Sequence, residues 1–169
     1  MKKIVIIASL VIVILSIIKE EKIIIPKEVI RFRVIANSNE EIDQQVKKEV
    51  VKNVTPLIKK MNQLTTLEES RNYIQENLPQ FTEIVDKTLE NNNYEKKFTI
   101  NYGKNFFPKK NYQDIIFEEG EYESLVITLG DGLGDNFWCL LFPPVCLSDQ
   151  ENDKVEYKSF LKEILEKYF

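Results

Sequence analysis

Residues 120–147 read GEYESLVITLGDGLGDNFWCLLFPPVCL and contain four of the chain's five glycines, its only tryptophan and both cysteines. Residues 121–129 alternate in polarity and are rich in β-branched and aromatic side chains, which predicts a central strand with both faces mostly covered. The run at 130–136 (GDGLGDN) tolerates positive φ angles, so we expect the chain to reverse there and enter a second strand at 137–142 (FWCLLF). Pro143–Pro144 must end that strand, because neither proline can donate a hydrogen bond to a sheet. We therefore expect a hairpin-like pair of strands, supported by the rest of the chain.

Two further segments have the two-residue period that is typical of strands. Residues 28–37 (EVIRFRVIAN) alternate as a half-buried strand, and residues 97–102 (KFTINY) alternate as a strand at the edge of the sheet. A short strand is also expected at 115–117. The predicted class is α/β (α+β), with a mixed or mainly antiparallel sheet of about four strands. The segments that form it are 29–37, 97–102, 122–129 and 137–142.

Apolar residues at spacings of three and four predict about four helices, packed against that sheet in a single domain. The first is expected to follow a capping box of Ser38 and Glu41 and to run to Met61. A kink or a break is expected near Thr55, because Pro56 removes one hydrogen bond of the helix.

Two more helices are predicted in the middle of the chain and one at its end. The second helix begins at a capping box in residues 65–68 or 66–69 and ends before Pro79. That proline opens a third helix over residues 79–91. The apolar residues of 155–169 follow a helical spacing, so we expect a final amphipathic helix docked on the domain.

The amino terminus has the pattern of a secretory signal. Lys2 and Lys3 precede an apolar run at 4–18, which places the amino terminus in the cytoplasm and the domain outside. The run is shorter than the ~20 residues that span a bilayer, which favours a signal sequence, but no small-x-small cleavage site follows it. Residues 1–25 are therefore predicted to be a signal sequence or an N-terminal membrane anchor, and residues 26–169 an extracytoplasmic domain. Membrane contact is expected only through residues 4–18.

The charge balance argues against nucleic acid as a partner. The chain has a net charge of −4, and residues 1–25 hold four lysines and two glutamates, so the remainder has a net charge of −6. Its basic residues are scattered among carboxylates, whereas a phosphate-binding surface needs them clustered. The chain also has no histidine, which removes the usual zinc, copper and Cys-His chemistry. We expect no metal and no cofactor.

Two sets of residues invite a catalytic or ligand-binding interpretation. The glycines of 130–136 lack the third glycine and the following helix of a dinucleotide fingerprint, and the acidic residues among them lack the twelve-residue calcium loop. Glu119, Glu121 and Glu123 suggest glycosidase carboxylates, so the alternative function is a secreted cell-wall hydrolase using the carboxylates near Glu121. Residues two apart on a strand share a face, however, and such a row is usually a solvated edge.

Cys139 and Cys146 are an even number of cysteines in a chain that is expected to be exported. Cys139 has no histidine to act as its base, which argues against a nucleophile. With the bend at Pro143–Pro144 between them, the two Cβ atoms can approach within bridging distance. A disulfide between Cys139 and Cys146 and two buried free thiols both remain open.

The run from 137 to 144 has more apolar surface than one strand usually hides. Alternate residues can face the core, and the others have the composition of an interface anchor. The candidate partner-binding residues are Phe137, Trp138, Phe142, Pro143 and Pro144.

Four blocks of the sequence are distinctive: 31–39 (RFRVIANSN), 101–104 (NYGK) with 107–108 (FP), 119–123 (EGEYE) and 132–146 (GLGDNFWCLLFPPVC). Together they resemble the stage II sporulation protein R family of endospore-forming bacteria over almost the whole exported domain. The departures are Phe137, where the family pattern has a second tryptophan, and the short tail after Leu147.

The resemblance implies an exported signalling protein of sporulation rather than an enzyme. Such a protein is made in the forespore and secreted into the space between the two sporulation membranes. There it activates a membrane-embedded aspartic protease of the mother cell, which cleaves the inactive precursor of sigma factor E. The implied partner is that protease, and the resemblance carries over no catalytic residue.

Overall fold

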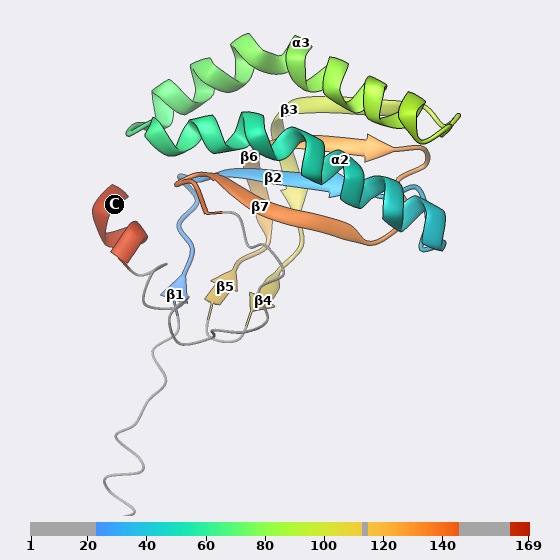
Figure 1. The fold of residues 1–169 in the computed structure, drawn as a ribbon. Helices are drawn as coiled ribbons and strands as arrows, with labels where there is room; N and C mark the ends of the chain where they lie inside the picture. The colour runs from blue at the N-terminus through green and yellow to red at the C-terminus, as the bar shows by residue number, and fades with distance from the viewer. Residues whose placement is uncertain (1–22, 113–114, 146–162) are drawn as a thin grey trace, which may run out of the picture.

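The computed structural model describes residues 23–112, 115–145 and 163–169 of the chain. Two long helices cover one face of a four-stranded sheet, and a small three-stranded sheet lies below its other face (Figure 1). This is the predicted α/β class in a single domain, with fewer helices than the sequence suggested.

The larger sheet has the strand order β3-β6-β2-β7. Its strands are β2 (Ile30–Ile35), β3 (Phe98–Phe107), β6 (Gly120–Leu129) and β7 (Asn136–Phe142). β6 is antiparallel to β3 and parallel to β2, whereas β2 is antiparallel to β7. The four predicted strands, the mixed sheet and the central place of β6 are confirmed.

The hairpin predicted from residues 120–147 is wrong, because β2 lies between β6 and β7. Residues 130–135 cross the end of β2 instead of returning directly, and β7 pairs with β2 from Asn136 opposite Ile35 to Phe142 opposite Ile30. Alternating polarity predicts that a segment is a strand, but it carries no information about which strand is its neighbour.

The smaller sheet has the order β1-β5-β4 and consists of β1 (Ile23–Ile24), β4 (Lys110–Tyr112) and β5 (Ile115–Phe117). β5 confirms the short strand that was expected there. The Ile25 N–H donates to the Ile116 carbonyl at 2.9 Å, and the Ile25 side chain is 2% exposed. The residues just before Pro26 are therefore part of the fold.

The first long helix, α2 (Glu41–Lys59), continues through Pro56 and leads into the 3₁₀ helix η1 (Lys60–Gln63). A break near Thr55 does not occur. Val54, Leu57 and Ile58 are buried against the sheet on both sides of the proline. Their packing outweighs the cost of an interior proline, which is about 3 kcal/mol.

The predicted capping box at the start of α2 is wrong. The N-cap residue is Glu40, whose side chain forms no cap bond. The Ser38 hydroxyl donates to Asp43 Oδ2 at 2.6 Å and accepts from the Glu40 N–H at 3.1 Å. The Glu40 N–H has thus taken the place of the expected donor to Ser38, the backbone N–H of Glu41, and the Asp43 carboxylate accepts the Ser38 hydroxyl proton.

The second long helix, α3 (Leu67–Asn91), merges two helices that were predicted separately. Its capping box is confirmed: Thr66 Oγ1 accepts from the Glu69 N–H at 3.2 Å, and Glu69 Oε2 accepts from the Thr66 N–H at 3.1 Å. Pro79 lies inside the helix because the buried stripe runs past it, from Ile74 to Phe81. Residues 163–168 are helical, and the rest of the predicted final helix lies outside the described residues.

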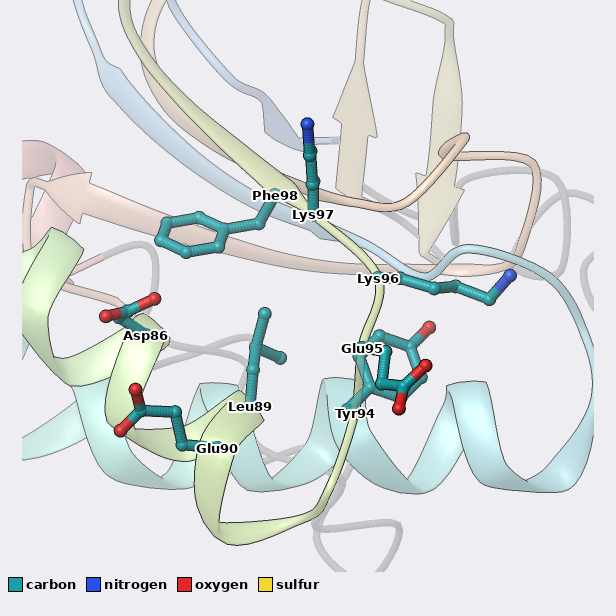
Figure 2. Close-up of a pocket in the computed structure, with 8 residues that line it drawn as sticks. All are labelled: Asp86, Leu89, Glu90, Tyr94, Glu95, Lys96, Lys97 and Phe98. Carbon is teal, nitrogen blue, oxygen red and sulfur yellow. The ribbon is translucent and has the colours of Figure 1, made fainter.

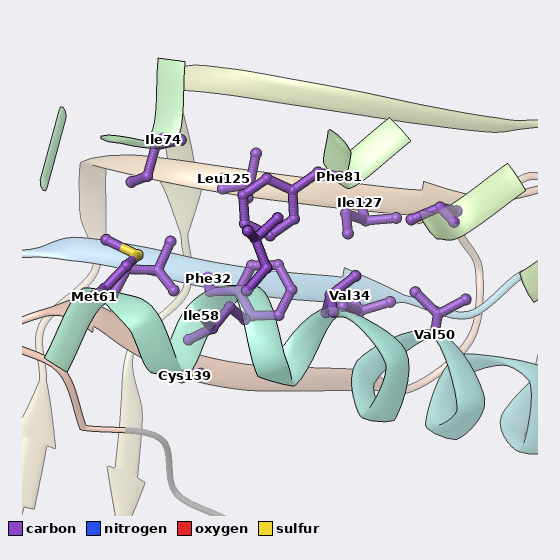
Figure 3. Close-up of a cluster of buried hydrophobic side chains, with 14 of the residues drawn as sticks. Phe32, Val34, Val50, Ile58, Met61, Ile74, Phe81, Leu125, Ile127 and Cys139 are labelled. Atoms are coloured by element: carbon purple, nitrogen blue, oxygen red, sulfur yellow. The ribbon is translucent and has the colours of Figure 1, made fainter. Parts of the chain in front are cut away.

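The main core fills the space between the two helices and the sheet (Figure 3). It includes Phe32, Val34, Val50, Ile58, Met61, Ile74, Phe81, Leu125, Ile127 and Cys139. A second core lies on the other face and joins the larger sheet to the smaller one. It includes Ile25, Val29, Phe107, Ile115, Phe117, Tyr122, Leu140 and Val145. Within the part of the chain described, no helix is both long and apolar enough to cross a bilayer.

Candidate functional site

β7 contributes to both cores, because its side chains alternate between the two faces of the sheet. Phe137, Cys139 and Leu141 pack against the helix-side core, whereas Trp138 and Leu140 pack against the opposite core. The Phe137 ring meets Phe32 edge to face, with centroids 6.2 Å apart. The strand therefore hides more of its apolar surface than one covered face would allow.

The end of β7 is more buried than its composition suggested. Phe142 is 4% exposed and its ring contacts Tyr168 edge to face at 5.2 Å between centroids. Pro143, which follows a cis peptide bond, is also buried, and Pro144 is half-buried. Of the five candidate partner-binding residues, Phe137, Trp138 and Pro144 keep part of their surface accessible.

Beneath the sheet, the guanidinium of Arg31 is enclosed by aromatic rings. Its Cζ atom lies 4.1 Å from the centroid of Phe107, 4.8 Å from those of Phe117 and Tyr122, and 5.5 Å from that of Trp138. Arg31 is 2% exposed, so these cation–π contacts are made in a desolvated site, where each is stronger than on a surface. The arginine ties β2 to β3, β5, β6 and β7.

Two further cations lie over the Trp138 ring, nearer the surface. The Arg33 Cζ is 4.7 Å from the ring centroid, and the exposed Lys110 Nζ is 5.8 Å from it. Burial lowers the pKa of the Arg33 guanidinium from its usual value. We call Trp138, Arg33 and Lys110 the Trp138 platform. It is a half-exposed aromatic surface with positive charge. It lies on the face of the sheet opposite the helices, beside the second core.

Sequence reasoning selected Trp138 but missed the arginines that contact it. The signal was present in the RFR sequence of residues 31–33, where two cations interrupt an otherwise apolar strand. Charges at positions 31 and 33 share one face of a strand, and a charge on a covered face needs partners. The rings of β3, β6 and β7 are those partners, and only the tertiary fold brings them together.

The three glutamates proposed as hydrolase carboxylates have different environments. Glu119 and Glu121 are exposed. Glu123 accepts hydrogen bonds from Arg71 Nε and Nη2 at 3.0 and 2.9 Å, and a further one from the Tyr102 hydroxyl. Burial alone would raise the pKa of Glu123, but the hydrogen bonds from Arg71 and Tyr102 outweigh it and hold the pKa below its usual range. Glu123 is thus an ionised structural group, which does not suit a general acid.

Cys139 is buried in the helix-side core, and Cys146 lies outside the described residues. The neighbouring residues Leu140 and Val145 form an antiparallel bridge, with reciprocal backbone hydrogen bonds of 3.0 and 3.2 Å. The chain therefore folds back on itself between them.

A shallow pocket of about 370 Å³ lies where α3 leads into β3 (Figure 2). Its lining residues are Asp86, Leu89, Glu90, Tyr94, Glu95, Lys96, Lys97 and Phe98. Figure 2 shows the side chains of Lys96 and Lys97 pointing away from the carboxylates of Asp86 and Glu90. The Tyr94 hydroxyl donates to Asp43. This lining pairs no nucleophile with a base, so it offers no catalytic set.

Comparison with known proteins gives one consistent result. The model of the family described as stage II sporulation protein R matches residues 26–152. Stage II sporulation protein R of Bacillus subtilis (strain 168) is 35% identical over 160 residues, which cover 88% of this chain and 70% of the relative. No solved structure matches.

Proposed function

The chain belongs to the stage II sporulation protein R family, and from this premise we propose that it is an exported signal that activates a membrane-embedded protease. Its role is in sporulation. The proposed signal is made in the forespore, crosses the forespore membrane by means of residues 1–25, and acts in the space between the two membranes. Its target is the aspartic protease of the mother cell, which then cleaves the precursor of sigma factor E.

We propose that the chain acts by binding and not by catalysis. Glu123 is held ionised by Arg71 and Tyr102, and its neighbours Glu119 and Glu121 are exposed. One carboxylate held by an arginine and two exposed ones do not provide the paired acid and nucleophile that a glycosidase places around its substrate. No observation in the described residues favours the alternative of a cell-wall hydrolase.

The observation that supports a binding role most directly is the Trp138 platform. Tryptophan and arginine are the residue types that most often carry binding energy at interfaces. Here a half-exposed tryptophan is held in place by Phe107, at 5.3 Å between ring centroids, and by Arg33. Trp138 lies on β7, within residues 132–146, one of the four blocks that resemble the family. We propose that Trp138, with the accessible parts of Phe137 and Pro144, contacts the protease.

We also propose a disulfide between Cys139 and Cys146 after export. The Leu140–Val145 bridge is a hydrogen-bonded antiparallel pair, so the positions on either side of it would face each other if the pairing continued for one residue. Cysteines that face each other in this way are within bridging distance. The disulfide would link the residue that directly follows Val145 to β7.

The test of this function is processing of the sigma factor E precursor in a non-sporulating host. The full chain is produced with the protease and the precursor, and the amount of cleaved precursor is compared with that from a chain lacking residues 1–22. That deletion keeps β1 and Ile25, so the described fold is left intact. We expect cleavage with the full chain only. Equal cleavage with the deleted chain, retained in the cytoplasm, would refute the requirement for export.

A second experiment distinguishes the binding role from the alternative of a cell-wall hydrolase. Purified protein is incubated with peptidoglycan, and soluble fragments are measured with and without the Glu121→Gln substitution. We expect no release of fragments from either protein. Release that depends on Glu121 would establish the hydrolase and overturn the binding role.

A further inference from the structure

The loop between β6 and β7, residues 130–135, is fixed at every backbone position. Each of its six successive N–H groups donates a hydrogen bond, at distances from 2.7 to 3.2 Å. The acceptors are Lys97 O, Asn37 Oδ1, Leu129 O, Asn37 O, Ala36 O and Asn39 Oδ1, in the order of the donors. In addition, Lys47 Nζ of α2 donates to the Asp135 carbonyl at 3.0 Å. The loop is therefore a rigid extension of the sheet.

The glycines of this loop are required by the space around them. A Cβ atom at Gly134 would lie 2.2 Å from the Ser38 carbonyl oxygen, and one at Gly130 would lie 2.2 Å from Asn37 Oδ1. Gly130 and Gly132 also have positive φ angles of 55° and 66°. The loop packs so closely on residues 36–39 that its conformation has little freedom.

Leu133 is the exception in this tightly packed loop. Its side chain is 81% exposed, more than any other large hydrophobic residue that the structure describes. Single exposed leucines are common on protein surfaces and need no explanation. This one differs because the backbone on both sides of it is fixed, and because the other residues of the GDGLGDN run are glycine, aspartate or asparagine. A plain turn would not need an apolar residue there.

The surroundings of Leu133 indicate what can bind it. Asp131 and Asp135 flank it and are exposed, and neither forms an ion pair with another described residue. Ile42, 49% exposed, lies in the first turn of α2, and the loop is tied to Asn39, just before that helix, through the Asp135 N–H. Two carboxylates beside an apolar side chain would be repelled by anionic lipid, but they complement a protein pocket with a basic rim.

We propose that Leu133 is an anchor residue, which inserts into an apolar pocket with a basic rim on a protein partner. A rigid loop loses little conformational entropy on binding, so an anchor held in this way retains most of its binding energy. The proposal rests on the proposed function, since the partner is taken to be the exported face of the protease. It adds a contact separate from the Trp138 platform.

The test uses the full chain, produced with the protease and the precursor, and three variants. Leu133→Ala removes the anchor, Leu133→Met restores an apolar side chain of similar volume, and Phe106→Ala is the matched control. Phe106 is also exposed, at 62%, but lies on the edge strand β3 opposite Glu121, at the other end of β6. The amount of cleaved precursor and the dose of chain needed for half-maximal cleavage are measured, together with the resistance of each chain to proteolysis.

We expect Leu133→Ala to need a dose about 30-fold higher, as for an interface hot spot of ~2 kcal/mol, with unchanged resistance to proteolysis. Leu133→Met should recover most of the activity, and Phe106→Ala should match the unsubstituted chain. Normal activity of Leu133→Ala overturns the inference while leaving the proposed function standing. Absence of cleavage with the unsubstituted chain overturns the proposed function, and the inference with it.

A photoreactive amino acid at position 133, with position 106 as control, identifies what the anchor touches. The inference predicts an adduct with the protease from position 133 and none from position 106. An adduct only with a second copy of this chain, or only with lipid, overturns it. So does an adduct from both positions, because contact would then not be specific to the loop.

Discussion

Replacement of Trp138 by alanine measures how much its side chain contributes to the stability of the fold and how much it contributes to binding the partner. The ring is half-buried, lies 5.3 Å from Phe107 between centroids, and has Arg33 4.7 Å from its centre. Truncation of a fully buried tryptophan costs about 3–5 kcal/mol, so a half-buried one should cost about 2 kcal/mol. For a chain of this size, that loss should lower the Tm by about 4–8 °C.

The assay is thermal unfolding of the domain, followed by circular dichroism, beside cleavage of the sigma factor E precursor. Trp138→Phe is the matched control, because it keeps a ring over Phe107 and should lose about half as much stability. A double-mutant cycle with Arg33→Gln isolates the cation–π contact, which should couple the two residues by about 0.5–1 kcal/mol.

Two results would refute this reasoning. An unchanged Tm would mean that the ring does not pack as described, and a fall of more than about 15 °C would mean that it is wholly core. If a folded Trp138→Ala chain still supports normal cleavage of the precursor by the protease, the partner surface lies elsewhere. We expect instead that cleavage falls by more than the modest loss of stability explains.

Three other predictions test separate parts of the account. Glu123→Gln should destabilise the domain by about 2 kcal/mol at pH 7, because it weakens a charge-assisted contact with Arg71. The pKa of Glu123 is lowered in the folded state, so its contribution is present above the unfolded pKa of about 4.3 and is lost as the pH falls through the folded value; the two stability curves should converge in acid, and parallel curves would contradict this. Thr66→Ala should cost about 1 kcal/mol in denaturant unfolding, because it removes the cap of α3; no change would mean that the helix start frays. The intact mass of the exported protein should rise by two protons on reduction, and an unchanged mass would show that Cys139 and Cys146 are not bridged.

The sequence predicted the elements better than their connections. All four strands of the larger sheet were identified, because apolar alternation reflects burial on a face, which is a local property. The order of the strands depends on contacts between distant segments, so β2 between β6 and β7 was not foreseen. Pro79 was misjudged, since it lies inside α3, whose buried stripe continues past it; Pro56 lies inside α2 without breaking it.

The candidate site was predicted in part. Trp138 was selected from its composition, but Phe142 and Pro143 proved to be buried. The apolar side chains of residues 137–144 suggested an interface, but most of their surface is buried. Both faces of β7 pack against a core, one between the sheet and the helices and the other between the two sheets. Leu133 was absent from the candidates, because its significance comes from hydrogen bonds to residues 36–39, almost a hundred positions earlier in the chain.

The most direct test of the central claim is a reconstitution in vesicles. The protease is inserted in one orientation with the precursor on its cytoplasmic side, and the purified domain is added either to the opposite, exported side or to the precursor's side. The account predicts cleavage of the precursor only when the domain is on the exported side, in proportion to the amount added. Cleavage that is the same without the domain, or the same from either side, would contradict it.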